Sequence, residues 1–124
     1  MNYRVLFIGI VFFSCSSSRM METTLYFGQS KPGGGMVTEK EWNSFKEEYI
    51  SKVFKEGCSI IHVEGAWKDT STNELITEPT YQVVYYYKTS PAVSRQIDSL
   101  RYWYQTLYQQ QSVLRVDKNV KTSF

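Results

Sequence analysis

The sequence contains few of the residues that most often build metal and catalytic sites. It has one histidine, His62, and two cysteines, Cys15 and Cys58, among 124 residues. A single histidine excludes a two-histidine metal site within one copy of the chain, and we expect neither a metal ion nor another cofactor. A large charge of one sign is also missing, because 14 Lys and Arg residues face 12 Asp and Glu residues. This balance is not that of a nucleic-acid-binding protein, so we expect no nucleic-acid partner.

A hydrophobic run long enough to cross a bilayer is absent as well. The run from Val5 to Phe13 has about nine residues, against the roughly 20 that a membrane-spanning helix needs. It follows the basic Arg4 and ends at the small Ser14, directly before Cys15, which is the order of an export signal. We therefore expect residues 1–14 to be a signal peptide.

Cys15 stands where a bacterial lipoprotein carries its lipid, and the stretch before it resembles a lipobox. Phe12 and Phe13 depart from the usual pattern, so a plain signal peptide cleaved nearby and an uncleaved anchor stay open. If Cys15 is lipidated, more than one acyl chain holds the protein stably on a membrane. Residues 15–22 would be the tether. Ser16 replaces the Asp that resembles the inner-membrane retention signal of enteric bacteria, which favours the periplasmic side of the outer membrane.

Cys58 is the only other thiol, so an intrachain disulfide is not expected once Cys15 carries lipid. It opens an apolar, strand-like run, and no metal-binding or catalytic spacing surrounds it. We interpret it as a small core residue rather than as a nucleophile or redox sensor.

Aromatic residues are abundant instead: the chain has 10 Tyr, 7 Phe and 3 Trp. Such rings can close a small core, and the length allows one domain, which we place at 23–117 with a loose tail at 118–124. Hydrophobic period predicts strands at 23–28, 59–67, 75–87 and 112–117 and helices at about 39–54 and 91–107. The order βαββαβ is that of an α+β, ferredoxin-like sandwich, one antiparallel sheet with two helices on one face.

The third predicted strand is apolar on both faces. Tyr81, Val83, Tyr85 and Tyr87 alternate with Gln82, Val84 and Tyr86, and only one of these sets can meet the helices. The other set would leave an exposed patch, which marks an interface or a ligand groove. We take Tyr81, Tyr85 and Tyr87 as the candidate binding face, with ordinary half-exposed tyrosines as the alternative.

A set of short motifs is spread along the chain. The motifs are Leu25, Tyr26, Phe27 and Gly28, then Gly35, Val37, Trp42 and Phe45, then Gly65, Trp67, Glu78 and Pro79, and finally the run from Ser112 to Arg115. As a set they resemble the bacterial family called domain of unknown function 3574. The resemblance covers about Thr23 to Asp117 and implies small exported proteins and lipoproteins, but no activity.

Several other residues are weaker candidates for chemistry. His62 and Glu64 share a face of one strand and could form an acid and base pair, although on an edge strand a solvated pair is more common. Glu78 and Asp69 are candidates to place carboxylates at one end of a hairpin, with a structural bend as the alternative. The remaining candidates are a glycine loop at 33–35 that could bind an anion or simply connect two elements, and a basic spot of Arg101, Arg115 and Lys118.

These observations favour a non-enzymatic, membrane-tethered periplasmic domain. Its aromatic sheet face would serve self-association, as in a homodimer, or binding of a protein, a glycan or a small apolar ligand. The alternative is a small enzyme whose pocket lies between two ferredoxin-like domains, with His62 and Glu64, or Tyr85 and Tyr87, inside it. The direction of His62 distinguishes them, because an enclosed pocket favours the enzyme and open solvent favours the binding domain.

Overall fold

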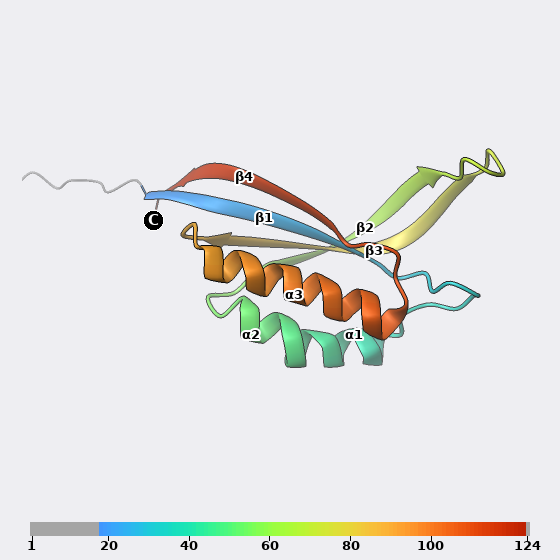
Figure 1. Ribbon diagram of the computed structural model, residues 1–124, viewed down its shortest axis with the longest axis horizontal. Helices are drawn as coiled ribbons and strands as arrows, with labels where there is room; N and C mark the ends of the chain where they lie inside the picture. The colour runs from blue at the N-terminus through green and yellow to red at the C-terminus, as the bar shows by residue number, and fades with distance from the viewer. Residues whose placement is uncertain (1–17, 124) are drawn as a thin grey trace, which may run out of the picture.

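The sheet has four strands, and its two central members are the first and third along the chain. The computed structural model describes residues 18–123, and its sheet order is β2-β3-β1-β4. The strands are β1 (Ser18–Gly28), β2 (Ser59–Lys68), β3 (Leu75–Tyr87) and β4 (Leu114–Thr122), and every neighbouring pair is antiparallel. Both helical segments lie on one side of this sheet (Figure 1). The predicted ferredoxin-like α+β fold is confirmed.

The first helical segment is continuous but changes its winding. It consists of α1 (Glu39–Phe45), one π-helical stretch η1 (Lys46–Ile50) and α2 (Ser51–Val53). Thr38 caps it: its hydroxyl accepts from the Glu41 amide, while the Glu41 carboxylate accepts from the Thr38 amide at 2.8 Å. This reciprocal pair is a capping box. A further bond from Lys31 to the same carboxylate is the largest cause that holds the pKa of Glu41 at about 2.

The second helix, α3 (Pro91–Tyr108), is the longest element. It begins where the sequence predicts, with Ser90 as the N-cap and Pro91 in the first turn. It ends at Gln109, whose φ of 55° places the residue in the left-handed region. Two tyrosines join it to the rest of the fold, because Tyr104 donates to the Gly28 carbonyl and Tyr108 donates to the Glu41 carbonyl, each at 2.9 Å.

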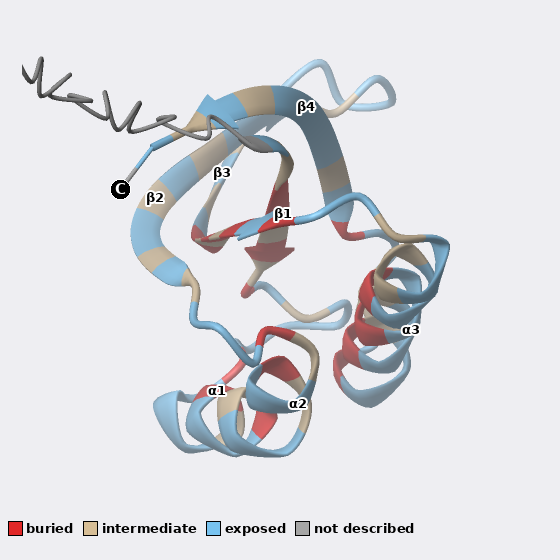
Figure 2. Ribbon diagram, turned by 90° about the vertical axis from the view of Figure 1, so that its left-hand side faces the viewer, coloured by how far each residue is buried: buried red, intermediate tan, exposed pale blue. Residues whose placement is uncertain are grey.

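The core lies between the sheet and the helices and is built mainly from rings. Phe27 of β1 contacts Tyr104 edge-on at 4.7 Å, and Trp42 of α1 stacks on Tyr81 of β3 at 4.1 Å. Figure 2 shows burial concentrated on the central strands and on the inner sides of the helices, whereas β2 and β4 are mostly exposed or intermediate. The aromatic residues therefore close a small core, as expected.

Three local predictions differ from the structure. The tail expected to be loose from Lys118 is wrong for 118–122, because β4 continues to Thr122 and pairs with β1 from Ser18 onward. The tether expected to reach residue 22 is too long for the same reason. Pro79 cannot donate to a ladder, which predicts a bulge or bend in this strand, but no bulge forms because the pairing of β2 with β3 runs unbroken through Glu64 and Pro79. Instead, β3 pairs with β1 from Thr80 to Tyr87 and lacks this partner in its first residues. The β2–β3 hairpin therefore projects past the sheet (Figure 1).

Candidate functional site

The binding face predicted from Tyr81, Tyr85 and Tyr87 is wrong, because these rings belong to the core. They are 7%, 5% and 4% exposed, respectively. They lie on the helix-covered side of β3, since they pair with Phe27, Thr23 and Met21 of β1. Tyr85 stacks on Phe54 at 4.3 Å, and the Tyr87 hydroxyl lies 3.1 Å from that of Thr23. They therefore cannot line a pocket between subunits either.

The opposite side of the sheet carries no helix, and we call it the helix-free face. Its central position is polar but covered, because Thr24 is buried between Val84 and Val116 of the neighbouring strands. Around it, large apolar side chains from three strands are exposed to solvent. They are Ile61 and Trp67 of β2, Tyr86 of β3, and Leu114 and Val116 of β4.

The helix-free face carries an ion pair beside Tyr86. Lys118 of β4 forms an ion pair with Glu22 of β1 at 2.9 Å. The hydrogen bond from Lys118 is the largest cause that lowers the pKa of Glu22, and the hydrogen bond to Glu22 raises the pKa of Tyr86. This face is therefore locally neutral, apolar and open.

Among residues 18–123, strand β2 forms one edge of the sheet and pairs with β3 alone. His62 and Glu64 share its helix-facing side, as predicted, and both are exposed. The His62 ring meets Tyr81 edge-on at 4.5 Å, and no ion pair among residues 18–123 joins it to Glu64. His62 thus lies at an open edge and not in an enclosed pocket.

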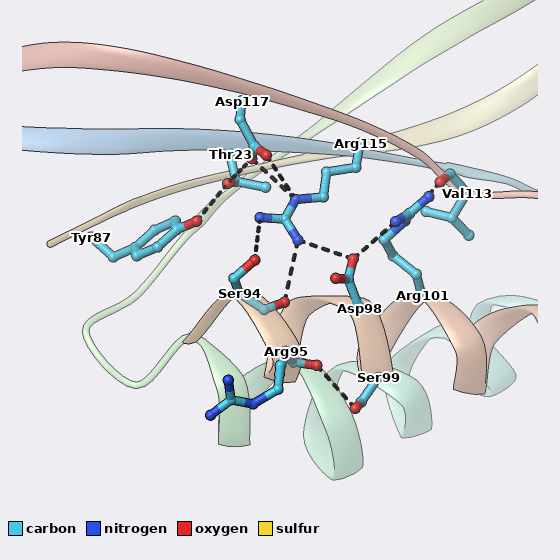
Figure 3. Close-up of polar contacts among 10 residues, drawn as sticks. All are labelled: Thr23, Tyr87, Ser94, Arg95, Asp98, Ser99, Arg101, Val113, Arg115 and Asp117. Carbon is cyan, nitrogen blue, oxygen red and sulfur yellow. Dashed lines mark hydrogen bonds and ion pairs between the residues drawn. The ribbon is translucent and has the colours of Figure 1, made fainter. Parts of the chain in front are cut away.

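The other edge strand, β4, is fixed to α3 by a network around Arg115 (Figure 3). The Arg115 guanidinium donates to Asp117, to Asp98 and to the carbonyl and hydroxyl of Ser94. Its side chain is 12% exposed. Burial opposes the charge of Arg115, but the hydrogen bonds to Asp117 and Asp98 raise its pKa overall. Arg101 also pairs with Asp98, at 2.9 Å.

The basic spot considered for Arg101, Arg115 and Lys118 is therefore wrong. All three lie opposite carboxylates, the first two at Asp98 and the third at Glu22.

A polar cleft of about 420 Å³ opens where three segments meet. The β2–β3 hairpin contributes Trp67, Ile76 and Glu78, and the loops before α1 and after α3 supply the rest. Its lining residues are Ser30, Lys31, Pro32, Trp67, Ile76, Glu78, Gln110, Gln111 and Ser112.

Glu78 has a fixed place in this polar cleft. One of its carboxylate oxygens accepts from the Ser30 amide at 3.3 Å. The carboxylate also packs on the Gly28 backbone, where an added Cβ would lie 2.9 Å from both oxygens. Gly28 is therefore required for this close approach. The sequence suggested Glu78 as a candidate but paired it with Asp69, whose carboxylate instead accepts from Ser71 and Thr72 within the hairpin loop.

A shallower groove of about 880 Å³ lies on the helix-free face near the start of β1. Met20, Val84, Tyr86 and Val120 give it an apolar floor, and Cys58 stands at its border. Cys58 is half-buried and packs against the core, as predicted, and burial raises the pKa of its thiol. Cys15, the predicted lipid site, lies outside the described residues.

The glycine loop forms a turn of its own. Gly33, Gly34 and Gly35 have φ values of 83°, 102° and 85°, which residues with a side chain rarely adopt. The Gly34 amide donates to the Lys31 carbonyl, so this amide serves the turn rather than an anion.

Residues 18–123 contain no group of three or more His, Cys, Asp or Glu side chains arranged to hold a metal ion. Within the same range, no helix has the length and hydrophobicity needed to cross a membrane.

A family model described as "Protein of unknown function (DUF3574)" matches residues 22–124. The chain is a member of the DUF3574 family. The match begins within β1 and includes all the later strands and helices, so the family resemblance seen in the sequence is confirmed. No curated protein matches this DUF3574 chain in sequence.

Solved structures share the fold of the DUF3574 chain at low sequence identity. A phage SAM lyase in complex with S-methyl-5'-thioadenosine is 12% identical with a TM-score of 0.60, covering 85% of this chain and 90% of that one. CutA from Synechococcus elongatus PCC7942 is 13% identical with a TM-score of 0.52, covering 85% and 80%. These similarities establish the fold alone.

Proposed function

We propose that this DUF3574 chain is a non-enzymatic domain, anchored by lipid on Cys15, that self-associates by pairing β2 with β2 of a second copy. The observation that carries the proposal is the state of this edge. β2 has ten residues, includes Ile60, Ile61, Val63 and Trp67, and is exposed or half-exposed along its whole length. An unpaired, apolar edge strand is a template for another strand.

Hydrogen-bonding complementarity favours a second copy as the occupant, because an imidazole N–H can donate to a carboxylate. If the two β2 strands pair antiparallel with Val63 opposite Val63, His62 of each copy lies opposite Glu64 of the other. Opposite side chains in such a pair share a face and interact. A shift of the pairing that placed Glu64 opposite Glu64 would bring like charges together. The register with Val63 opposite Val63 therefore gives both His62 and Glu64 a polar partner. The contact occurs twice, because the pair of strands is two-fold symmetric.

The position of His62 supports a binding domain over an enzyme. Its ring lies against Tyr81 at an open edge, not inside a cavity, and Tyr85 and Tyr87 are core residues. The similarity to a phage SAM lyase concerns the fold alone and does not identify reacting groups at the β2 edge.

The proposed anchor would hold the domain close to the membrane. β1 begins at Ser18, so Ser16 and Ser17 are the only residues between it and Cys15. The three residue steps from Cys15 to Ser18 span at most about 11 Å. The end of the sheet where β1 starts would thus lie at the bilayer surface, on the periplasmic side of the outer membrane, and pairing between copies would occur within that plane.

The self-association is tested by the solution mass of the chain from Ser16 onward, which retains every strand and helix. Light scattering should give a dimer. His62→Glu places glutamates opposite each other, and Glu64→Lys places lysine opposite histidine, so each should weaken the dimer by about tenfold. The double variant places glutamate opposite lysine and should recover the parent's affinity for the dimer to within about threefold. Asn119→Glu, on the exposed side of β4, is the control and should leave the dimer unchanged.

A chain that is monomeric at hundreds of micromolar would overturn the self-association. Equal weakening by both single variants with no recovery in the double variant would overturn the register.

The anchor is tested separately with the full chain in a Gram-negative host. Detergent partitioning should place the parent in the detergent phase and Cys15→Ser in the aqueous phase. Retention of Cys15→Ser in the detergent phase would contradict lipidation at this residue without affecting the dimer test.

A further inference from the structure

We infer that the polar cleft binds a pyranose sugar, with Trp67 as the stacking surface and Glu78 and Gln110 as hydrogen-bonding groups. Trp67 lies at the end of β2 that the proposed pairing also uses, so the variants below are chosen to separate the two proposals. The polar cleft has a volume of about 420 Å³, which fits one or two sugar units.

The aromatic surface is the first element of the site. Trp67 is 49% exposed and faces Ile76 across the hairpin. An exposed indole beside hydrogen-bonding groups suits a ligand that is apolar on one side and polar at its rim. A pyranose ring has this character, because its C–H groups form an apolar face and its hydroxyls lie around the edge.

The hydrogen-bonding groups are held in place before any ligand arrives. The Glu78 carboxylate accepts from the Ser30 amide at 3.3 Å and lies against the Gly28 backbone. In the hydrogen bonds of the described residues its Oε1 atom takes no donor, so it can accept from a hydroxyl. The Gln110 amide nitrogen donates to the Ser30 carbonyl at 2.8 Å and to the Tyr108 carbonyl at 3.3 Å. This leaves the amide oxygen of Gln110 as a further acceptor.

The charge of the cleft argues against an anionic ligand. Lys31 is the positively charged residue of the cleft lining. Its ammonium group forms an ion pair with Glu41 at 2.8 Å and lies over the ring of Tyr108. Glu78 then remains as the charge available to a ligand. A cationic ligand would match one carboxylate, but cages for quaternary ammonium groups use several aromatic faces. Here one exposed ring stands among amides and hydroxyls of Gln110, Gln111, Ser30 and Ser112, a set that suits several ligand hydroxyls.

The experiment titrates the purified chain with maltotriose, cellotriose and chitotriose and follows binding by calorimetry. At least one of the three should bind in the millimolar range or tighter. Trp67→Ala should weaken that binding by at least tenfold, Trp67→Phe should recover part of the loss, and Glu78→Gln should weaken it several-fold. Trp103→Ala is the matched control, because Trp103 is 44% exposed on α3 and lines no part of the cleft.

The variants keep the test interpretable. His62→Glu should bind the sugar like the parent, so a failure of the β2 dimer is distinguishable from a failure of this site. Thermal unfolding shows whether a variant has lost its fold, and Trp67→Phe retains the ring if Trp67→Ala does not fold. No binding of any of the three sugars, binding unchanged by Trp67→Ala, or tighter binding of choline than of every sugar would each overturn the inference.

Discussion

The two edges of the sheet, β2 and β4, have the same number of partners and very different side chains. β4 carries Arg115, Asp117, Lys118 and Lys121, and a nearly buried guanidinium ties it to α3. β2 carries mainly apolar residues, and none of the ion pairs among residues 18–123 involves it. Charged residues protect an edge strand from pairing with other chains. The fold therefore closes one edge and leaves the other open, which is what an interface on β2 requires.

The largest expected effect comes from releasing β4. Arg115→Ala removes the donor shared by Asp98, Asp117 and Ser94, and should lower the free energy of unfolding by about 2–3 kcal/mol. Urea denaturation measures this change. Lys118→Ala is the control on the same strand, since the Lys118 side chain is 62% exposed and such pairs contribute about 0–1 kcal/mol. Equal losses in both variants would contradict an anchor centred on Arg115.

An intermediate effect should follow from protecting β2 in the manner of β4. Ile61→Lys adds a charge on the exposed side of the strand and should make the chain monomeric while changing the free energy of unfolding by less than about 0.5 kcal/mol. Light scattering and denaturation report the two quantities. Val116→Lys makes the same type of change on β4 and should leave the dimer intact. Dimer loss in Val116→Lys instead would place the interface at β4.

The smallest effect concerns acid. Burial raises the pKa of Asp98, but hydrogen bonds from Arg101 and Arg115 outweigh it, so the pKa lies below the ordinary value of 3.8. A carboxylate with a lowered pKa stabilises the fold above its unfolded pKa, and this contribution is lost as the pH falls through the folded value. Between pH 5 and 2.5, Asp98→Asn should therefore lose less stability than the parent in urea denaturation. Parallel pH profiles would show that Asp98 does not contribute to holding β4 under these conditions.

Element order and type were predictable because they depend on local pattern. The spacing of Ile97, Leu100 and Tyr104 and the Ser90–Pro91 start predicted α3, and alternation from Leu75 to Tyr87 predicted β3 with its observed bounds. The polar strand end from Lys118 to Thr122 was missed because its stability comes from pairing with Ser18–Glu22, almost a hundred residues away.

The candidate site was only partly predictable, because alternation defines two sets of side chains but not which set meets the helices. Tyr81 and Tyr85 are covered because they share a side with Phe27 and Thr23, which only the register between β1 and β3 reveals. The other set, with Val84 and Tyr86, was visible in the sequence and marks the exposed face. The polar cleft combines residues near 30, 67–78 and 110–112, and no local signal brings these three segments together.

The pairing of Ser18 with Thr122 makes a circular permutant of the domain feasible. These two residues are direct partners across β1 and β4, so the two ends of the domain are neighbours in space. A short linker could join them, and a new opening could be made in the exposed hairpin loop at 70–73, where such cuts are best tolerated. That circular permutant would keep all four strands and the aromatic core, with its termini moved to the far end of the hairpin.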